Sequence, residues 1–140
     1  MIKFNLFINC LFVIFFLLNN CFSQEKIVKS ISISGTSSNN QKIVFFNNEI
    51  MNINFDELSS KIYNFYYSIE HYDYNWEPSN IFKNEYITGF DDVRISNYKK
   101  SFNTLQKFTN YSFNIPNRNF KIRSSGNYKL IVKDNRNNIV

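Results

Sequence analysis

The sequence predicts an all-β domain built as a β-sandwich. Three observations support this fold class. Apolar and polar residues alternate with a period of two in short runs, turn-forming residues separate the runs at intervals of roughly 8 to 12 residues, and no helical periodicity of useful length competes. Aromatic residues make up 19% of the chain, including 16 Phe and 9 Tyr, and such side chains suit strands that pack one face into a core.

The clearest strand signal begins at Ile62 and leads into the loop that holds the chain's single Trp. No Gly or Pro interrupts the alternation before His71, so we expect one face of this central strand to be buried. That face takes every second residue, namely Tyr63, Phe65, Tyr67 and Ile69.

After His71 the chain is predicted to turn. Asp73, Asn75 and Pro78 replace the alternation, and these residue types bond to nearby backbone or fix φ. Trp76 lies among them. Burying a Trp removes roughly 150 to 250 Å² of surface from water, at about 25 cal/mol per Å², so we expect Trp76 to pack under the loop and close one end of the core. A solvent-facing ligand platform is the alternative.

Shorter strands are predicted on both sides of the central strand. Preceding it are strands at 27–34, 43–46 and 50–55, a loop at 35–40, a tight turn at 47–49, and room for one helical turn at 56–60. Following it are an irregular segment at 81–87 with a short strand near 85–87, an extended piece at 93–105, and strands at 111–115, 120–122 and 128–132, with breaks at Pro116 and 124–127. A total of roughly seven to nine short strands is typical of an immunoglobulin or fibronectin III-like sandwich.

The two ends of the chain carry their own signals. Residues 1–23 have a basic start, an apolar run and small residues before a cleavage point, which predicts a signal peptide and not a membrane-spanning helix. A lipid-modified Cys21 is the alternative, but Asn20 fits that motif poorly. The domain is then 24–140, and it contains no cysteine for a disulfide. Because 134–138 resembles a hairpin turn followed by a strand start, we expect the chain to be truncated at its C-terminus.

Charge and motifs argue against several function classes. The net charge of +5 comes from scattered lysines and arginines, which indicates a solvated surface and not a nucleic-acid site. His71 is the only histidine, and three glycines leave little material for a phosphate loop, so no enzyme constellation can be assembled. The run 73–77 mimics half a calcium loop but lacks the required Gly and Glu. We therefore expect no catalytic residue, metal or cofactor, and we expect His71 to form hydrogen bonds where the strand meets the loop.

Several runs of residues carry a family resemblance. They are FDEL (55–58), YYSIEHYDYNWEPSN (66–80), EYITGFDD (85–92), SFNTL (101–105), NYSFNIPN (110–117) and SGNYKLIVKD (125–134). In their order and spacing the sequence resembles the N-terminal domain of the type IX secretion system plug proteins of Bacteroidetes. Tyr72 and Asn110 depart from that pattern, which usually has Cys and often has His at these positions, but neither change removes a turn or a core position.

The resemblance implies a β-sandwich at the start of a longer periplasmic protein. Such a protein binds the periplasmic mouth of the outer-membrane translocon barrel and seals it by protein-protein contact, at the inner face of the outer membrane. The alternative is a generic exported immunoglobulin-like module that binds carbohydrate or mediates adhesion. Under either hypothesis the partner-binding or structural loop positions to test are His71, Tyr72, Tyr74, Trp76, Pro78, Phe82 and Phe90. Each aromatic side chain among them could instead cover the core.

Overall fold

The computed structural model describes residues 28–35, 38–41, 44–45, 49–59 and 61–140, and in this part of the chain it is all-β. Ten strands and one four-residue helix are present there. The strands are β1 (Val28–Gly35), β2 (Ser38–Gln41), β3 (Met51–Glu57), β4 (Tyr66–Tyr72), β5 (Ile87–Gly89), β6 (Val93–Arg94), β7 (Asn97–Lys100), β8 (Thr109–Ile115), β9 (Phe120–Ile122) and β10 (Asn127–Lys133), and the helix is α2 (Lys83–Tyr86). The all-β prediction is confirmed, whereas the signal peptide lies outside the described residues and stays a prediction.

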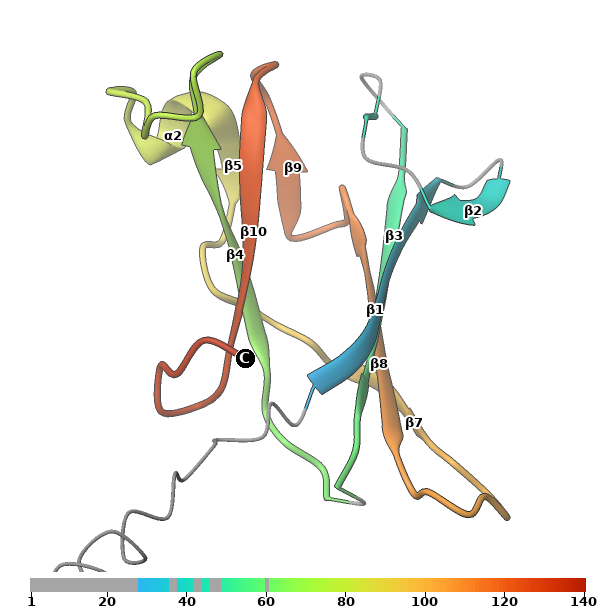
Figure 1. The fold of residues 1–140 in the computed structure, drawn as a ribbon. Coiled ribbons are helices and arrows are strands. Elements are labelled where there is room, and N and C mark those ends of the chain that lie inside the picture. Colours follow the sequence, from blue (N-terminus) through green and yellow to red (C-terminus); the bar gives the residue numbers. More distant parts are fainter. Residues whose placement is uncertain (1–27, 36–37, 42–43, 46–48, 60) are drawn as a thin grey trace, which may run out of the picture.

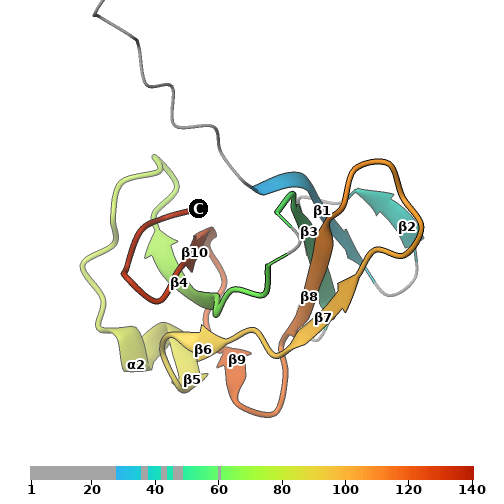
Figure 2. The same ribbon diagram turned by 90° about the horizontal axis from the view of Figure 1, so that it is seen from below.

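The strands form antiparallel sheets. The largest has the order β2-β1-β3-β8-β7, the second has the order β10-β4-β6, and β5 pairs with β9. Figure 1 shows the two larger sheets standing face to face, and Figure 2 shows β5 and β9 along one side between them. The central strand of the prediction, β4, is therefore the middle strand of the second sheet.

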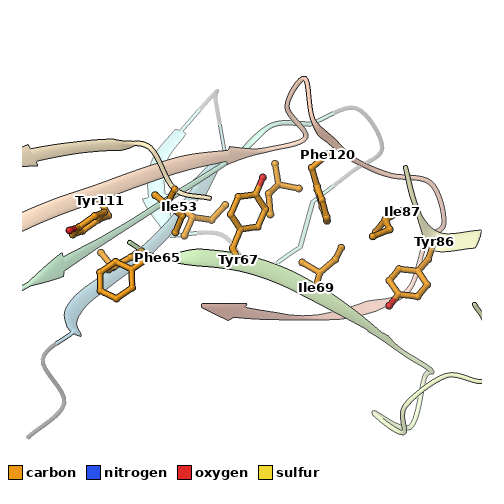
Figure 3. Close-up of a cluster of buried hydrophobic side chains, with 11 residues drawn as sticks. Ile53, Phe65, Tyr67, Ile69, Tyr86, Ile87, Tyr111 and Phe120 are labelled. Atoms are coloured by element: carbon orange, nitrogen blue, oxygen red, sulfur yellow. The ribbon is translucent and has the colours of Figure 1, made fainter. Parts of the chain in front are cut away.

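The core lies between the two larger sheets and is rich in aromatic rings (Figure 3). The period-two alternation predicted its β4 face: Phe65, Tyr67 and Ile69 are each no more than 2% exposed. From the opposite sheet, Phe113 stacks on Tyr67 with ring centroids 4.3 Å apart. Offset stacking of this kind stabilises aromatic pairs beyond the area that they bury. The remaining buried apolar residues of the cluster are Ile53, Phe55, Tyr86, Ile87, Ile95, Tyr111, Ile115 and Phe120.

Tyr111 on β8 links the two sheets through both its ring and its hydroxyl. The ring is fully buried, stacks on Phe55 at 5.3 Å and meets Phe65 edge-on at 4.9 Å. Its hydroxyl accepts a hydrogen bond from the Tyr63 backbone N–H at 2.7 Å and donates one to the Tyr63 carbonyl at 3.2 Å. These two bonds satisfy the backbone of the segment that enters β4, where no ladder partner is available.

The helical turn expected at 56–60 is wrong. Asp56 and Glu57 extend β3 instead, because they pair with Asn110 and Thr109 on β8. The Asn110 amide donates to the Asp56 carboxylate at 2.7 Å, which gives the extended form a side-chain partner. Glu57 is fully buried, and one of its carboxylate oxygens accepts the Ser59 N–H at 2.8 Å, whereas the other has no partner among the described residues.

Other local predictions also need correction. The loop expected at 35–40 includes the start of β2, which pairs with β1, and residues 44–45 are not in a strand, although 43 and 46 lie outside the described residues. The turn at 47–49 cannot be compared, because 47 and 48 are also outside them. The segment 81–87 contains α2, where the Glu85 carboxylate accepts the Phe82 N–H. The extended piece at 93–105 ends at Lys100, and Asn103 takes a positive φ of 54° in the loop that follows.

The last turn of the chain agrees with its prediction. The Asp134 carboxylate accepts the backbone N–H groups of Arg136 and Asn138, as turn-forming aspartates do. Beyond the turn, Ile139 bridges to Lys133 on β10 in the antiparallel sense.

Replacing Tyr111 with Phe is expected to lower the free energy of unfolding by about 1 to 3 kcal/mol, because the Tyr63 N–H and C=O lose their partner while the ring stays in place. Urea unfolding followed by circular dichroism measures the change. Tyr98→Phe is the matched control, since Tyr98 is a half-exposed neighbour on β7 whose hydroxyl makes no hydrogen bond in the described structure. Removing this hydroxyl should change the free energy of unfolding by no more than about 0.5 kcal/mol. Equal effects of the two changes would contradict the linking role of Tyr111.

Candidate functional site

The loop after β4 is organised by Asp73. Its side-chain Oδ1 accepts the backbone N–H groups of Asn75 at 2.8 Å and Glu77 at 3.0 Å, and its backbone closes the turn to Trp76 and Glu77. An aspartate used in this way holds a turn, which is the ordinary role of the residue type. No group of three or more potential metal ligands occurs among the described residues.

His71 ties three segments together at the end of β4. Its Nε2 lies 3.1 Å from the Ser125 carbonyl oxygen, and because a carbonyl can only accept, Nε2 is the donor in this contact. Its Nδ1 lies 2.8 Å from the Ser79 hydroxyl. The strand, the far side of the loop and the turn before β10 are therefore held by one side chain.

The turn before β10 also supports the loop. The Asn127 amide donates to the Asp73 carbonyl at 2.7 Å. Gly126 has a φ of +152°, and a Cβ at this position would lie 2.1 Å from His71 Nε2. Only glycine combines this backbone conformation with so close an approach to the ring. The loop is thus a defined structure before it meets any partner.

Trp76 does not close the core, which corrects the expectation from the sequence. Its side chain is 62% exposed, and Tyr74 beside it is 87% exposed. Trp76 has a positive φ of 62° in the tight turn that its N–H closes onto the Asp73 carbonyl at 3.1 Å. The only described ring contact of Trp76 is with Tyr72, at a centroid distance of 6.2 Å.

Tyr86 and Tyr128 occupy the place that was expected for Trp76. The His71 ring lies 5.5 Å from Tyr86 and 5.0 Å from Tyr128. Tyr86 is 7% exposed. The sequence analysis did not predict that Tyr86 and Tyr128 close this end of the core. The alternation at 128–132 did indicate a strand with Tyr128 on one of its faces.

The other candidate positions lie near the loop or beyond it. Pro78 is exposed and bridges back to Tyr72, so it belongs to the loop itself. Phe82 precedes α2 and Phe90 follows β5, and their side chains are 78% and 71% exposed. No ring contact in the described structure joins either phenylalanine to Trp76.

The exposed rings border a shallow depression on the surface. Its lining comes from the loop and from the turn before β10, and includes His71, Tyr72, Tyr74, Trp76, Gly126 and Asn127. Exposed Trp and Tyr side chains beside backbone polar groups are what protein interfaces use as anchors. The site is therefore an open depression with exposed aromatic rings beside it, on a loop that hydrogen bonds hold in place.

The fold and this loop define an all-β domain that presents aromatic side chains at one end of its sheets. Residues 28–140 match the family model described as the first domain of type 9 secretion system plug proteins. The chain therefore belongs to this family, which is a structural component of a secretion system and not a known enzyme family, and the resemblance found in the sequence is confirmed.

A solved structure is similar over most of the chain. It is the crystal structure of a hypothetical protein from Parabacteroides merdae ATCC 43184, with a TM-score of 0.75 and 26% sequence identity. The match covers 82% of this chain but only 30% of that protein, so the present chain corresponds to less than a third of its length. Comparison with curated proteins found no match. Among the described residues, no helix is long and apolar enough to cross a membrane.

Buried tyrosines make the stability of the domain sensitive to alkaline pH. Burial raises the pKa of Tyr128 to about 12 and also raises the pKa values of Tyr67 and Tyr111 above 10.0. An unfolded chain loses these protons near pH 10, so above that pH the folded state binds more protons than the unfolded state. We therefore expect the free energy of unfolding to fall as the pH rises from about 10 to about 12. Urea unfolding over this range measures the fall, and Tyr128→Phe should make it smaller; a flat or rising profile would contradict the burial of these hydroxyls.

Proposed function

We propose that this domain is part of a non-enzymatic periplasmic plug of the type IX secretion system. The single observation that carries the proposal is the match of residues 28–140 to the first domain of that plug family. The exposed Tyr74 and Trp76 on a preformed loop support a role in protein contact. The proposed partner is the outer-membrane translocon barrel, and the proposed place is the periplasmic side of that membrane, reached through a signal peptide at 1–23.

A plug needs no chemistry. It blocks a wide barrel by covering it over a large interface, and its affinity must be reversible so that a passing substrate can displace it. A rigid loop suits this task, because binding then costs little conformational entropy. His71, Asp73 and Asn127 supply that rigidity through their hydrogen bonds.

We also propose that the fold is an immunoglobulin-like sandwich. One sheet of that fold has the strand order A-B-E-D, and the same order is found here in β1-β3-β8-β7. In the other sheet, β4 corresponds to strand C and β10 to strand F. Loops of such a sandwich cluster at its two ends, and the loop after β4, which leads to β6, then corresponds to the C–C′ loop at one of these ends.

Carbohydrate binding remains the second candidate, because Tyr74 and Trp76 are exposed as a sugar platform would require. A sugar site also needs free carboxylates or amides beside the rings. Asp73 Oδ1 already accepts two backbone N–H groups, and the Asn127 amide donates to the Asp73 carbonyl. Asp73 and Asn127 thus hold the loop, whereas the exposed side chains of Asn75 and Glu77 beside Trp76 make no hydrogen bond in the described structure. The family match, and not the polar chemistry of the loop, therefore favours the plug.

Capture by the detergent-solubilised translocon barrel tests the proposal. Trp76→Ala and Tyr74→Ala are each expected to reduce capture at least tenfold, a loss of about 1.4 kcal/mol or more, as aromatic anchors do. Ile31→Ala is the control, since Ile31 is an exposed apolar residue on β1, outside the loop after β4, and its loss should leave capture unchanged. Recovery of soluble glycans without the barrel would overturn the plug proposal and favour the second candidate.

A further inference from the structure

Two large apolar side chains protrude from the loop that joins β7 to β8. Phe102 is 94% exposed, and Leu105 is as exposed as in an extended chain. Figure 1 places this loop at the end of the molecule opposite α2. Single exposed apolar residues are common, but two on one tip that buries neither side chain call for an explanation.

The loop is held in a conformation that keeps these side chains outside. The Ser101 N–H donates to the Phe108 carbonyl at 2.9 Å, and the Phe108 N–H donates to the Ser101 hydroxyl at 3.0 Å. The Gln106 amide then donates to the Leu58 carbonyl at 3.0 Å, which fixes the tip against the segment after β3. The exposure of Phe102 and Leu105 is therefore built into the hydrogen bonding of the loop.

Lysines surround this tip. Three exposed lysines lie on the same hairpin, namely Lys99, Lys100 and Lys107. A fourth, Lys61, lies beside the hairpin, because its carbonyl accepts a hydrogen bond from the Thr109 hydroxyl and Thr109 pairs with Lys100. The sequence contains no Asp or Glu from 93 to 133. None of these four lysines has a carboxylate partner in the described structure, since the nearby Asp56 bonds to Asn110 and Glu57 is buried.

Protection of an edge strand explains only part of this arrangement. β7 is the outer strand of its sheet, and lysines on such strands hinder unwanted pairing with other chains. That accounts for Lys99 and Lys100. It does not account for the exposed Phe102 and Leu105, which would promote association.

We propose that the β7–β8 tip, defined as 99–107 together with Lys61, docks on an anionic phospholipid surface. Phe102 and Leu105 enter the boundary between headgroups and acyl chains, while the surrounding lysines contact phosphate groups and extend their aliphatic stems over the interface. Charge complementarity favours an anionic lipid surface, because the charged residues around the apolar side chains of the tip are all lysines. The site is separate from the Trp76 loop, and the proposal does not depend on the plug function.

An indole placed at the tip tests this docking directly. In the 140-residue chain, Trp76→Phe removes the single indole and Phe102→Trp introduces one at the tip. Vesicles made of equal parts phosphatidylcholine and phosphatidylglycerol are expected to shift the emission of the new indole to shorter wavelength, and pure phosphatidylcholine vesicles are not. Trp76→Phe with Phe82→Trp is the control at the other end of the domain, and its emission should not change. No shift at the tip, or an equal shift at both positions, would overturn the proposal.

The lysines are tested by the affinity for the same vesicles, measured by co-sedimentation. Lys99→Gln with Lys100→Gln is expected to lower it about fivefold per lysine, because each cation near such a surface contributes a comparable factor. Lys121→Gln with Lys129→Gln removes the same net charge from β9 and β10 and should have a much smaller effect. Equal losses would mean that only total charge matters and would contradict docking by the tip. A tip indole that responds to the solubilised barrel and not to vesicles would identify a protein contact instead.

Discussion

The contact between the two larger sheets through Tyr111 is the constraint on which the rest of the structure depends. No cysteine follows Cys21 in the sequence, so packing and hydrogen bonding must hold the sheets together. Tyr111 does both, because its ring lies between Phe55 and Phe65 and its hydroxyl satisfies the Tyr63 backbone. This contact fixes the segment that enters β4 against β8. The loop after β4 is positioned in turn by the strand that it follows.

The core of the domain is closed by side chains of its own strands and helix, so exposed side chains at the two ends are not needed to cover it. Tyr86 and Tyr128 pack around His71 and seal the end near α2, so Trp76 is not needed for stability there. The opposite end carries the lysine-surrounded Phe102. The two ends therefore differ in chemistry, one with exposed aromatic rings on a rigid loop and the other apolar and basic. The two proposals therefore assign the protein contact and the lipid contact to opposite ends of the domain.

The sequence predicted the parts of the fold in which local pattern and tertiary packing agree. The alternation at 63–69 and 111–115 gave the buried faces of β4 and β8, because each strand has one face in the core. The predictions from the sequence were wrong where contacts between distant segments determine the local conformation. Asp56 favours a turn in isolation but pairs with Asn110 across the sheet. At the site, the loop and its residues were predicted, whereas the exposure of Trp76 was not, because the tyrosines that take its place come from distant segments.

The fluorescence of Trp76 tests the central claim most directly, since it is the only Trp in the chain. The claim is that a rigid loop keeps this indole in solvent until a partner covers it. Iodide should quench its emission in the free domain almost as well as that of a free indole, and the translocon barrel should protect it. An indole already protected in the free domain would contradict the account, as would one that remains equally quenchable when the barrel is bound.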